Sequence, residues 1–266
     1  MVLILMPINW LVESVKWKLL INRIQPINLA RSFKAVISGI TIGIATPNRI
    51  GEIGGRILFI EKKNRNYGII VTWIGSFSQF ITTITTGVFG LILLLWFYPN
   101  LLYKSELINT ITFLLLILFL VLIVWLFFNI SKLKSFLLRF PFLKSKINLL
   151  NSLSNIPNSI LIKILFLSLI RFAIFSFQYY LLLHFFNVKI SIFDSLISTS
   201  LIYLFTTLVP TTTLAELGIR GSLAIFFIGL FSENIPNIVF ASFTLWIINL
   251  AIPALIGSIF LIKNKS

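Results

Sequence analysis

The sequence predicts an all-α, polytopic integral membrane protein: a helical bundle with two broken or re-entrant helical hairpins related as an inverted repeat. Three observations predict this class. The 266 residues are 58% hydrophobic and only 11% charged, whereas a soluble domain carries about 25% charged residues. Several uncharged runs reach the roughly 20 apolar residues with which a helix crosses a bilayer. Two further apolar segments are interrupted by proline, glycine and charged residues.

Composition also excludes several classes of function. The chain has no Cys, which excludes thiolate metal sites, cysteine nucleophiles and a disulfide scaffold. Its net charge of +15 would suggest nucleic acid in a soluble protein, but here the basic residues gather in polar connections instead of on one face. We therefore expect no nucleic-acid partner. No His cluster or glycine-rich phosphate loop is present, and we expect no metal, no cofactor and no catalytic residue.

The elements follow from the uncharged runs. Residues 1–12 are apolar but, as a helix, would reach only about 18 Å, so we expect a partly interfacial helix followed by a basic stretch from Glu13. The span at 67–98 is long for one crossing, and a bend near Gly87 or Gly90 would shorten it. We expect spans over residues 67–98, 107–130, 161–186 and 237–262, broken hairpins over 35–60 and 195–231, and a basic cytoplasmic loop over about 131–160.

Basic residues assign the sides of the membrane, because cytoplasmic loops collect Lys and Arg. The stretches 13–34, 61–66 and 131–160 and the end of the chain are rich in them, and Lys16 belongs to the first. The connections that carry only Lys104 and Lys189 are assigned outside. The first hairpin then enters from inside and the second from outside, in the inner (plasma) membrane.

The two broken segments share a Glu-x-Gly-x-Arg pattern. One reads Glu52-Ile-Gly54-Gly-Arg56 and the other Glu216-Leu-Gly218-Ile-Arg220, and each follows a proline by five or six residues. Matching broken elements from opposite faces are typical of inverted-repeat transporters. We expect one transmembrane domain over 1–266, with half-repeats over about 35–98 and 195–262. The predicted helix breaks, where glycine would also let another helix or a ligand come close, are Pro47, Gly54, Pro210 and Gly218.

Charge at membrane depth predicts the site. Four arginines face two glutamates there, and an unpaired Arg costs about 2.5 kcal/mol or more. The surplus predicts an anionic partner such as a lipid phosphate, which Arg binds in a bidentate way, although a water-filled cavity would also lower the cost. The glutamates could instead only form structural ion pairs, and Arg49 could snorkel to the interface. The candidate substrate-binding residues are Arg49, Glu52, Arg56, Arg171, Glu216 and Arg220.

These same residues resemble a known family. The stretch Thr46-Pro-Asn-Arg-Ile-Gly-Glu-Ile-Gly-Gly-Arg56 resembles the first signature of the flippase-like membrane domain of lysylphosphatidylglycerol synthases, which also occurs free-standing. Glu216-Leu-Gly-Ile-Arg-Gly-Ser222 is similar to its second signature, and Trp17 stands where the family usually has a tryptophan. The family generally has another helix before the one in which this chain starts, so we expect a truncated start. Many members also have an acidic residue where this chain has Gly221.

The resemblance implies an inner-membrane protein that moves, or helps to move, a lipid with a polar head group, such as an aminoacylated phospholipid or a lipid-linked glycan. Lysyl transfer resides in an appended soluble domain of the larger synthases, so we expect a non-enzyme. Together with the surplus of arginine, this predicts a flippase-like carrier of an anionic phospholipid or lipid-linked head group. The alternatives are a scaffold or accessory subunit that partners an envelope biosynthesis enzyme, and a transferase acting on a polyprenyl phosphate, which would lack an acidic metal site.

Overall fold

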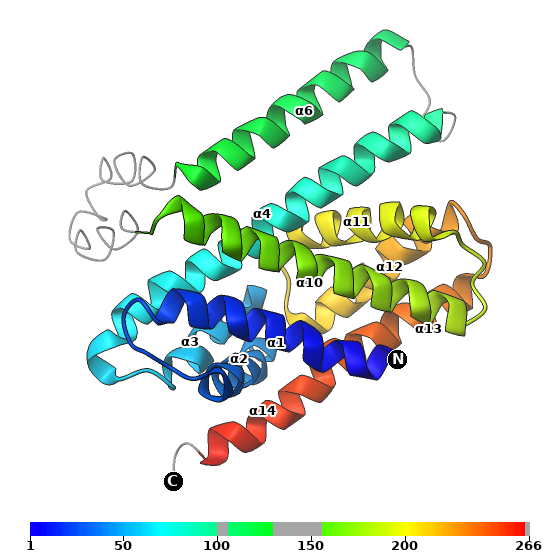
Figure 1. The fold of residues 1–266 in the computed structure, drawn as a ribbon. Helices are drawn as coiled ribbons and strands as arrows, with labels where there is room; N and C mark the ends of the chain where they lie inside the picture. Colours follow the sequence, from blue (N-terminus) through cyan, green and yellow to red (C-terminus); the bar gives the residue numbers. More distant parts are fainter. Residues whose placement is uncertain (100–105, 130–155, 264–266) are drawn as a thin grey trace.

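The computed structural model describes residues 1–99, 106–129 and 156–263, and its regular elements there are helices (Figure 1). Three short turns interrupt them: the 3₁₀ turns η1 (Pro47–Arg49) and η2 (Lys62–Asn64) and the π turn η3 (Ile247–Ala251). The α-helices are α1 (Val2–Ile21), α2 (Leu29–Ile44), α3 (Gly51–Ile57), α4 (Arg65–Phe97), α6 (Glu106–Phe128), α10 (Asn158–Phe185), α11 (Ile192–Leu208), α12 (Thr213–Gly229), α13 (Ile235–Trp246) and α14 (Ile252–Lys263).

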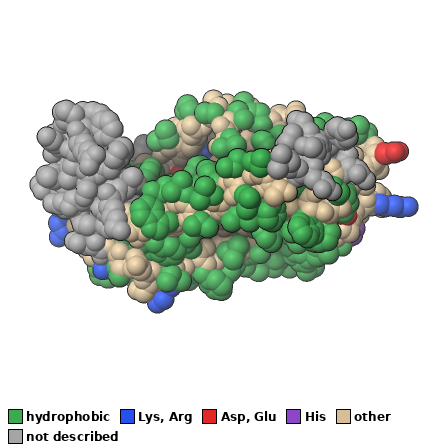
Figure 2. Space-filling model, turned by 90° about the horizontal axis from the view of Figure 1, so that it is seen from above, with side chains coloured by type: hydrophobic (Ala, Val, Ile, Leu, Met, Phe, Trp, Pro, Cys, Tyr) green, Lys and Arg blue, Asp and Glu red, His purple; other side chains and the backbone are tan. Residues whose placement is uncertain are grey.

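Within the described residues, four helical stretches are long and apolar enough to cross a membrane, which confirms the four predicted spans and the membrane class. On the face shown in Figure 2, hydrophobic side chains form a broad band, and charged side chains gather at its two ends. Helix α6 exposes large apolar side chains along its length, among them Leu114, Leu118 and Leu122. Such a surface is suited to lipid and unsuited to water. The stretches are Lys62–Phe97, Thr110–Phe128, Asn158–Phe185 and Ile235–Lys263.

Helix α4 runs without interruption through Gly87 and Gly90. These glycines serve packing instead: a Cβ on Gly87 would lie 2.4 Å from Leu204 Cβ, and one on Gly90 would lie 2.9 Å from Ser200 Cβ. Both positions therefore bring α11 close against α4. A helix of 33 residues is about 50 Å long, which a bilayer accommodates by helix tilt.

Helix α1 differs from the expectation. It does not end near residue 12 but continues to Ile21, which makes it about 30 Å long. Glu13 and Lys16 lie 2.8 Å apart, and only 2% and 1% of their side chains are exposed. Because the two charges neutralise each other, the helix can continue through the stretch that was assigned to a polar loop. The assignment of Lys16 to a polar stretch after the first helix is therefore wrong, because Lys16 lies buried on α1.

Two pairs of helices form the broken hairpins. The first joins α2 to α3 through η1, and the second joins α11 to α12 through residues 209–212. Pro47 and Pro210 lie in these interruptions, as expected. Helices α2 and α3 touch closely, since a Cβ on Gly55 would lie 2.6 Å from Gly39 Cα.

Gly54 and Gly218 are not helix breaks. They lie inside α3 and α12, where one glycine costs only about 1 kcal/mol relative to alanine. Neither permits a close approach in the structure, because nothing lies within 4 Å of a Cβ added at either position. The glycine of the shared pattern therefore leaves open space in front of its helix in both hairpins.

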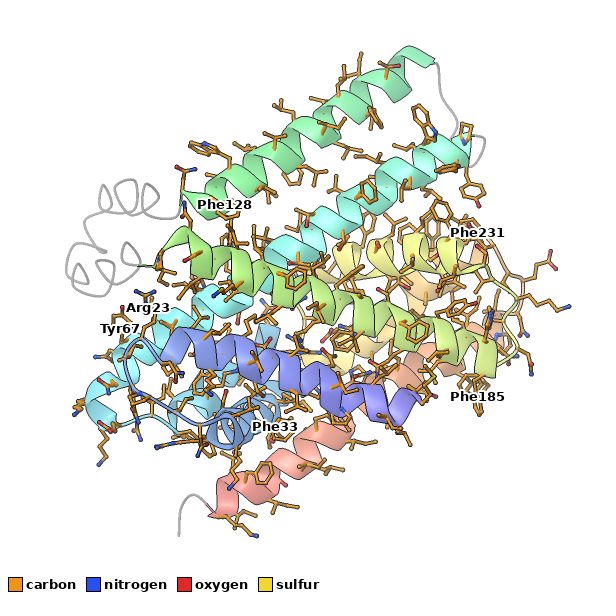
Figure 3. All side chains as sticks on the ribbon, in the orientation of Figure 1. Arg23, Phe33, Tyr67, Phe128, Phe185 and Phe231 are labelled. Carbon is orange, nitrogen blue, oxygen red and sulfur yellow. The ribbon has the colours of Figure 1, made fainter. Side chains whose placement is uncertain are left out.

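The two hairpins open toward opposite ends of the molecule in Figure 1. The first connects to α1 and α4 at the end where Arg23 lies in Figure 3, which we call the basic end. The second connects to α10 and α13 at the other end, near Phe185. Each hairpin precedes a long helical stretch: α4 after the first, and α13, η3 and α14 after the second. An inverted-repeat symmetry, re-entry into a bilayer and the half-repeat boundaries remain predictions.

The predicted basic loop over 131–160 falls largely outside the described residues. Its last residues belong to helix α10, which begins at Asn158.

Candidate functional site

The tips of the two hairpins meet beside a cavity of about 570 Å³. Its walls come from both tips and from α1, α4, α10 and η3. All six residues that the sequence nominated line it: Arg49, Glu52, Arg56, Arg171, Glu216 and Arg220. Residues far apart in the chain thus share one chamber, while their role in binding remains a prediction.

Reciprocal hydrogen bonds hold the tips together. The backbone N–H of Asn48 donates to the carbonyl oxygen of Thr211 over 3.0 Å, and the N–H of Thr211 donates to Asn48 Oδ1 over 3.0 Å. Asn48 and Arg49 have φ values of 50° and 56°, in the left-handed region that Asn tolerates better than most residues. This tight turn places the Asn48 side chain against the second hairpin.

A first group of charges, which we call the tip cluster, consists of Arg49, Glu216 and Arg220. Arg49 Nη2 donates to Glu216 Oε2 over 2.9 Å, across the two hairpins. Arg220 Nη2 lies 2.5 Å from Glu216 Oε1, one helical turn away, and its guanidinium carbon lies 5.1 Å from the ring centre of Tyr203. The expected pair of Glu216 with Arg220 therefore exists, but Glu216 also binds Arg49. Arg49 is therefore ion-paired beside the cavity. The alternative prediction was a side chain that snorkels to the membrane interface.

A second group, the Glu13 cluster, consists of Glu13, Lys16, Glu52, Arg56 and Arg171. Arg56 Nη1 donates to Glu13 Oε1 over 2.8 Å and Arg56 Nη2 donates to Glu52 Oε2 over 3.1 Å. Glu13 Oε2 lies 2.8 Å from Lys16 Nζ and also accepts a hydrogen bond from Arg171. One buried carboxylate therefore joins α1, α3 and α10.

Neutral polar groups complete this cluster. Arg171 Nε donates to Asn9 Oδ1 over 2.9 Å, and its guanidinium carbon lies 4.9 Å from the ring centre of Trp10. Lys16 Nζ donates to Ser168 Oγ over 3.1 Å, and this hydroxyl lies 3.0 Å from that of Ser78. A polar path therefore crosses the bundle from α1 through α10 to α4, in a region otherwise packed with apolar side chains.

The charges lining the cavity do not balance. Glu13 and Lys16 were missed by the sequence analysis, but they carry opposite charges and leave the predicted surplus of two positive charges unchanged. The cationic side chains are those of Lys16, Arg49, Arg56, Arg171 and Arg220, and the anionic ones are those of Glu13, Glu52 and Glu216. In the described residues, no group of three His, Cys, Asp or Glu side chains is arranged to hold a metal ion.

A signal for the missed residues existed in the sequence. Asn9, Glu13 and Lys16 are spaced four and three apart, which places them on one face of a helix. The prediction that the first helix ends at residue 12 separated Asn9 from Glu13 and Lys16, so the shared helix face was not recognised. The π turn η3 was also missed; it brings Asn249 to the cavity, and π turns inside helices are frequent at functional sites.

Comparison with known proteins gives one match. The family model described as "Lysylphosphatidylglycerol synthase TM region" matches residues 1–257, which cover both hairpins and every charged residue of the cavity. No curated protein and no solved structure matches the chain.

Proposed function

The chain belongs to the family of the lysylphosphatidylglycerol synthase TM region, and on that premise we propose that it is a flippase-like protein that moves an anionic lipid head group across the membrane. The family connects the chain with lipid handling. The proposal adds that the handled group passes through the cavity between the hairpin tips. We place the protein in the inner membrane, with its basic end in the cytoplasm.

One observation carries the proposal: arginines from both hairpins and from α10 line a single cavity in a body whose surface is apolar. Arg56 comes from the first hairpin, Arg220 from the second and Arg171 from α10. An excess of arginine at membrane depth is costly unless an anion or water compensates it. A lipid phosphate supplies that anion and brings its own acyl chains, which the surrounding apolar surface accommodates.

In this proposal, the contacts of the tip cluster change in a fixed order during the movement. Glu216 forms ion pairs with both Arg49 and Arg220 while the tips are in contact. A phosphate that enters the cavity competes with the Glu216 carboxylate for the same guanidinium groups. As Arg49 turns to the phosphate, the ion pair between the hairpins is lost, and the tips can separate. The lipid is then released on the other side when Glu216 takes the arginines back.

This series of contacts needs no covalent step. The side chains hold and exchange an anion, and binding energy alone orders the events. The lipid is the partner in this proposal. A scaffold for an envelope biosynthesis enzyme, the alternative, would need neither exchange nor an occupied cavity.

A reconstituted translocation assay tests the proposal. Purified protein in liposomes is given a fluorescent anionic phospholipid, and the fraction reaching the other leaflet is followed with time. We expect Arg220→Ala to reduce the rate about tenfold or more, because one charge-assisted contact to phosphate, about 1.5–3 kcal/mol, is lost.

Arg31→Ala is the matched control, since Arg31 is exposed on α2 and lies outside the cavity. It should translocate at the rate of the unaltered protein. Thermal unfolding of each variant in detergent shows whether it is folded. Full translocation by folded Arg220→Ala would contradict the proposal and favour the scaffold.

A further inference from the structure

Resting on the proposed function, we infer that the cavity selects lipids whose head group carries two or more phosphate charges, as a phosphomonoester or a diphosphate does, over phosphodiester lipids with one. The inference concerns the charge of the head group. It rests on the distribution of charge around the cavity and on the hydrogen-bond donors that its walls leave unused.

The surplus of two positive charges is divided between the walls. The Glu13 cluster has three cationic groups and two carboxylates, so one positive charge is left over. The tip cluster has two guanidinium groups and one carboxylate, and again one positive charge is left over. A head group with two negative charges neutralises both walls, whereas a phosphodiester neutralises only one.

The unused hydrogen-bonding groups point to the same occupant. Three covered N–H groups on residues that line the cavity have no partner: Trp10 Nε1, Arg56 Nε and Arg220 Nε. The Tyr203 hydroxyl, which can donate or accept, and the acceptor Asn249 Oδ1 are unpartnered as well. Buried polar groups are normally satisfied, and among these covered groups N–H donors outnumber acceptors. A terminal phosphate offers three unsubstituted oxygens, and a phosphodiester offers two.

Head groups that carry an amine fit this cavity poorly. An amine cancels the charge of a phosphodiester, so the lipid brings no net negative charge to a chamber with a positive surplus. Glu52 and Glu216 are the more exposed carboxylates of the cavity, and both already accept from arginine. A cation would have to displace an arginine from one of them.

Competitive binding to the purified protein tests the inference. Native mass spectrometry at pH 8 compares phosphatidic acid, phosphatidylglycerol and phosphatidylcholine with identical acyl chains. At this pH a phosphomonoester, whose second pKa is about 6, carries nearly two charges. We expect phosphatidic acid to bind at least about tenfold more tightly than phosphatidylglycerol, because a second charge beside a partly buried guanidinium adds appreciable attraction.

Two further comparisons sharpen the test. A polyprenyl diphosphate, which carries about three charges at this pH, competes against phosphatidic acid to separate the sources: stronger binding of the diphosphate supports contact with both walls, and equal binding shows that two charges already neutralise the surplus. The variant Arg220→Gln removes one surplus charge and should reduce the preference to about threefold or less. Arg31→Gln, outside the cavity, should keep the full preference.

Equal binding of phosphatidic acid and phosphatidylglycerol would overturn the inference. If the protein also translocates phosphatidylglycerol as fast as phosphatidic acid, transport stands and the selection is wrong. If phosphatidic acid binds preferentially but no lipid is translocated, the selection stands and transport is wrong. An unchanged preference in folded Arg220→Gln would show that the tip cluster does not contribute.

Discussion

The two groups of charge around the cavity differ in their access to water. In the Glu13 cluster, the side chains of Glu13, Lys16, Arg56 and Arg171 are 1–8% exposed, and only Glu52, at 18%, is as accessible as the tip cluster. In the tip cluster, the side chains of Arg49, Glu216 and Arg220 are 13–27% exposed. Both use one carboxylate to bind more than one cation. They differ in how many elements each carboxylate joins and in how easily an anion from outside could replace it.

The difference in exposure gives the two clusters different roles: the Glu13 cluster holds helices together, and the tip cluster can exchange its ion-pair partner for a ligand. Breaking a dry ion pair leaves a buried charge without a partner, which costs about 3–5 kcal/mol, so Glu13 is suited to fix α1, α3 and α10 permanently. Water or a phosphate can take the place of a partly exposed carboxylate at much lower cost. The tip cluster is therefore the part of the cavity in which exchange with a ligand is feasible.

The largest expected effect belongs to Glu13. The variant Glu13→Gln keeps the shape of the side chain but leaves Lys16, Arg56 and Arg171 around a neutral amide. We expect it to lose about 3–5 kcal/mol of stability, measured by thermal unfolding in detergent and by the yield of monodisperse protein.

The matched control for this change is Glu61→Gln. Glu61 pairs with Lys63 over 3.2 Å at the surface, with side chains 51% and 78% exposed, and such pairs contribute about 0–1 kcal/mol. Combining Glu13→Gln with Lys16→Met restores the net charge and should recover part of the stability. If Glu13→Gln were as stable as Glu61→Gln, the Glu13 cluster would not hold the fold.

An intermediate effect is expected for Glu216→Gln. It frees Arg49 and Arg220 from their shared carboxylate, and water can reach both. We expect a loss of about 1–2 kcal/mol of stability, together with tighter binding and slower translocation of an anionic lipid, because the competing anion is gone. Unfolding and lipid binding measured on one preparation check both parts. A loss as large as that of Glu13→Gln, with lipid binding unchanged, would remove the contrast between the clusters.

The smallest effect provides a baseline outside the membrane-spanning helices. Tyr98, at the end of α4, donates to Asp194 Oδ1 over 2.5 Å, and this hydrogen bond raises the pKa of Tyr98. The stabilisation is fully present below the ordinary tyrosine pKa of about 10 and is lost as pH rises through the raised value. Tyr98→Phe should therefore lower stability by about 1 kcal/mol or less at pH 7.

Thermal unfolding at pH 7 and above pH 10 checks this expectation. The difference between Tyr98→Phe and the unaltered protein should shrink at the higher pH. A difference that is constant with pH would mean that the phenol hydroxyl is not the source of the stabilisation.

The spans and the residues that line the cavity could be predicted from the sequence, whereas the contacts of each residue could not. Uncharged runs identify spans because the bilayer sets a minimum length for a helix. The shared motif identified Arg56 and Arg220 because charge inside an apolar segment is rare unless it has a use. Both signals depend only on residues close together in the chain, so they can be recognised without knowing the tertiary contacts.

What could not be predicted depends on partners far apart in the chain. Glu13 looked like the start of a polar loop because the cations that neutralise it include Arg56 and Arg171, which lie 43 and 158 positions away. Gly54 looked like a break because glycine disfavours the interior of a helix, yet helix α3 continues through it. Only the packing shows that Gly55, its neighbour, makes the close contact with α2.

In the proposed mechanism transport depends on separation of the hairpin tips, and a reversible cross-link tests this most directly. Because the chain has no Cys, Asn48→Cys with Thr211→Cys introduces the only two thiols at positions whose backbones are hydrogen-bonded. Oxidation should stop translocation of an anionic lipid in liposomes, and a reductant should restore it, while each single variant is indifferent to both treatments. If the oxidised, demonstrably cross-linked protein moved lipid as fast as the reduced protein, tip separation could not be part of the mechanism.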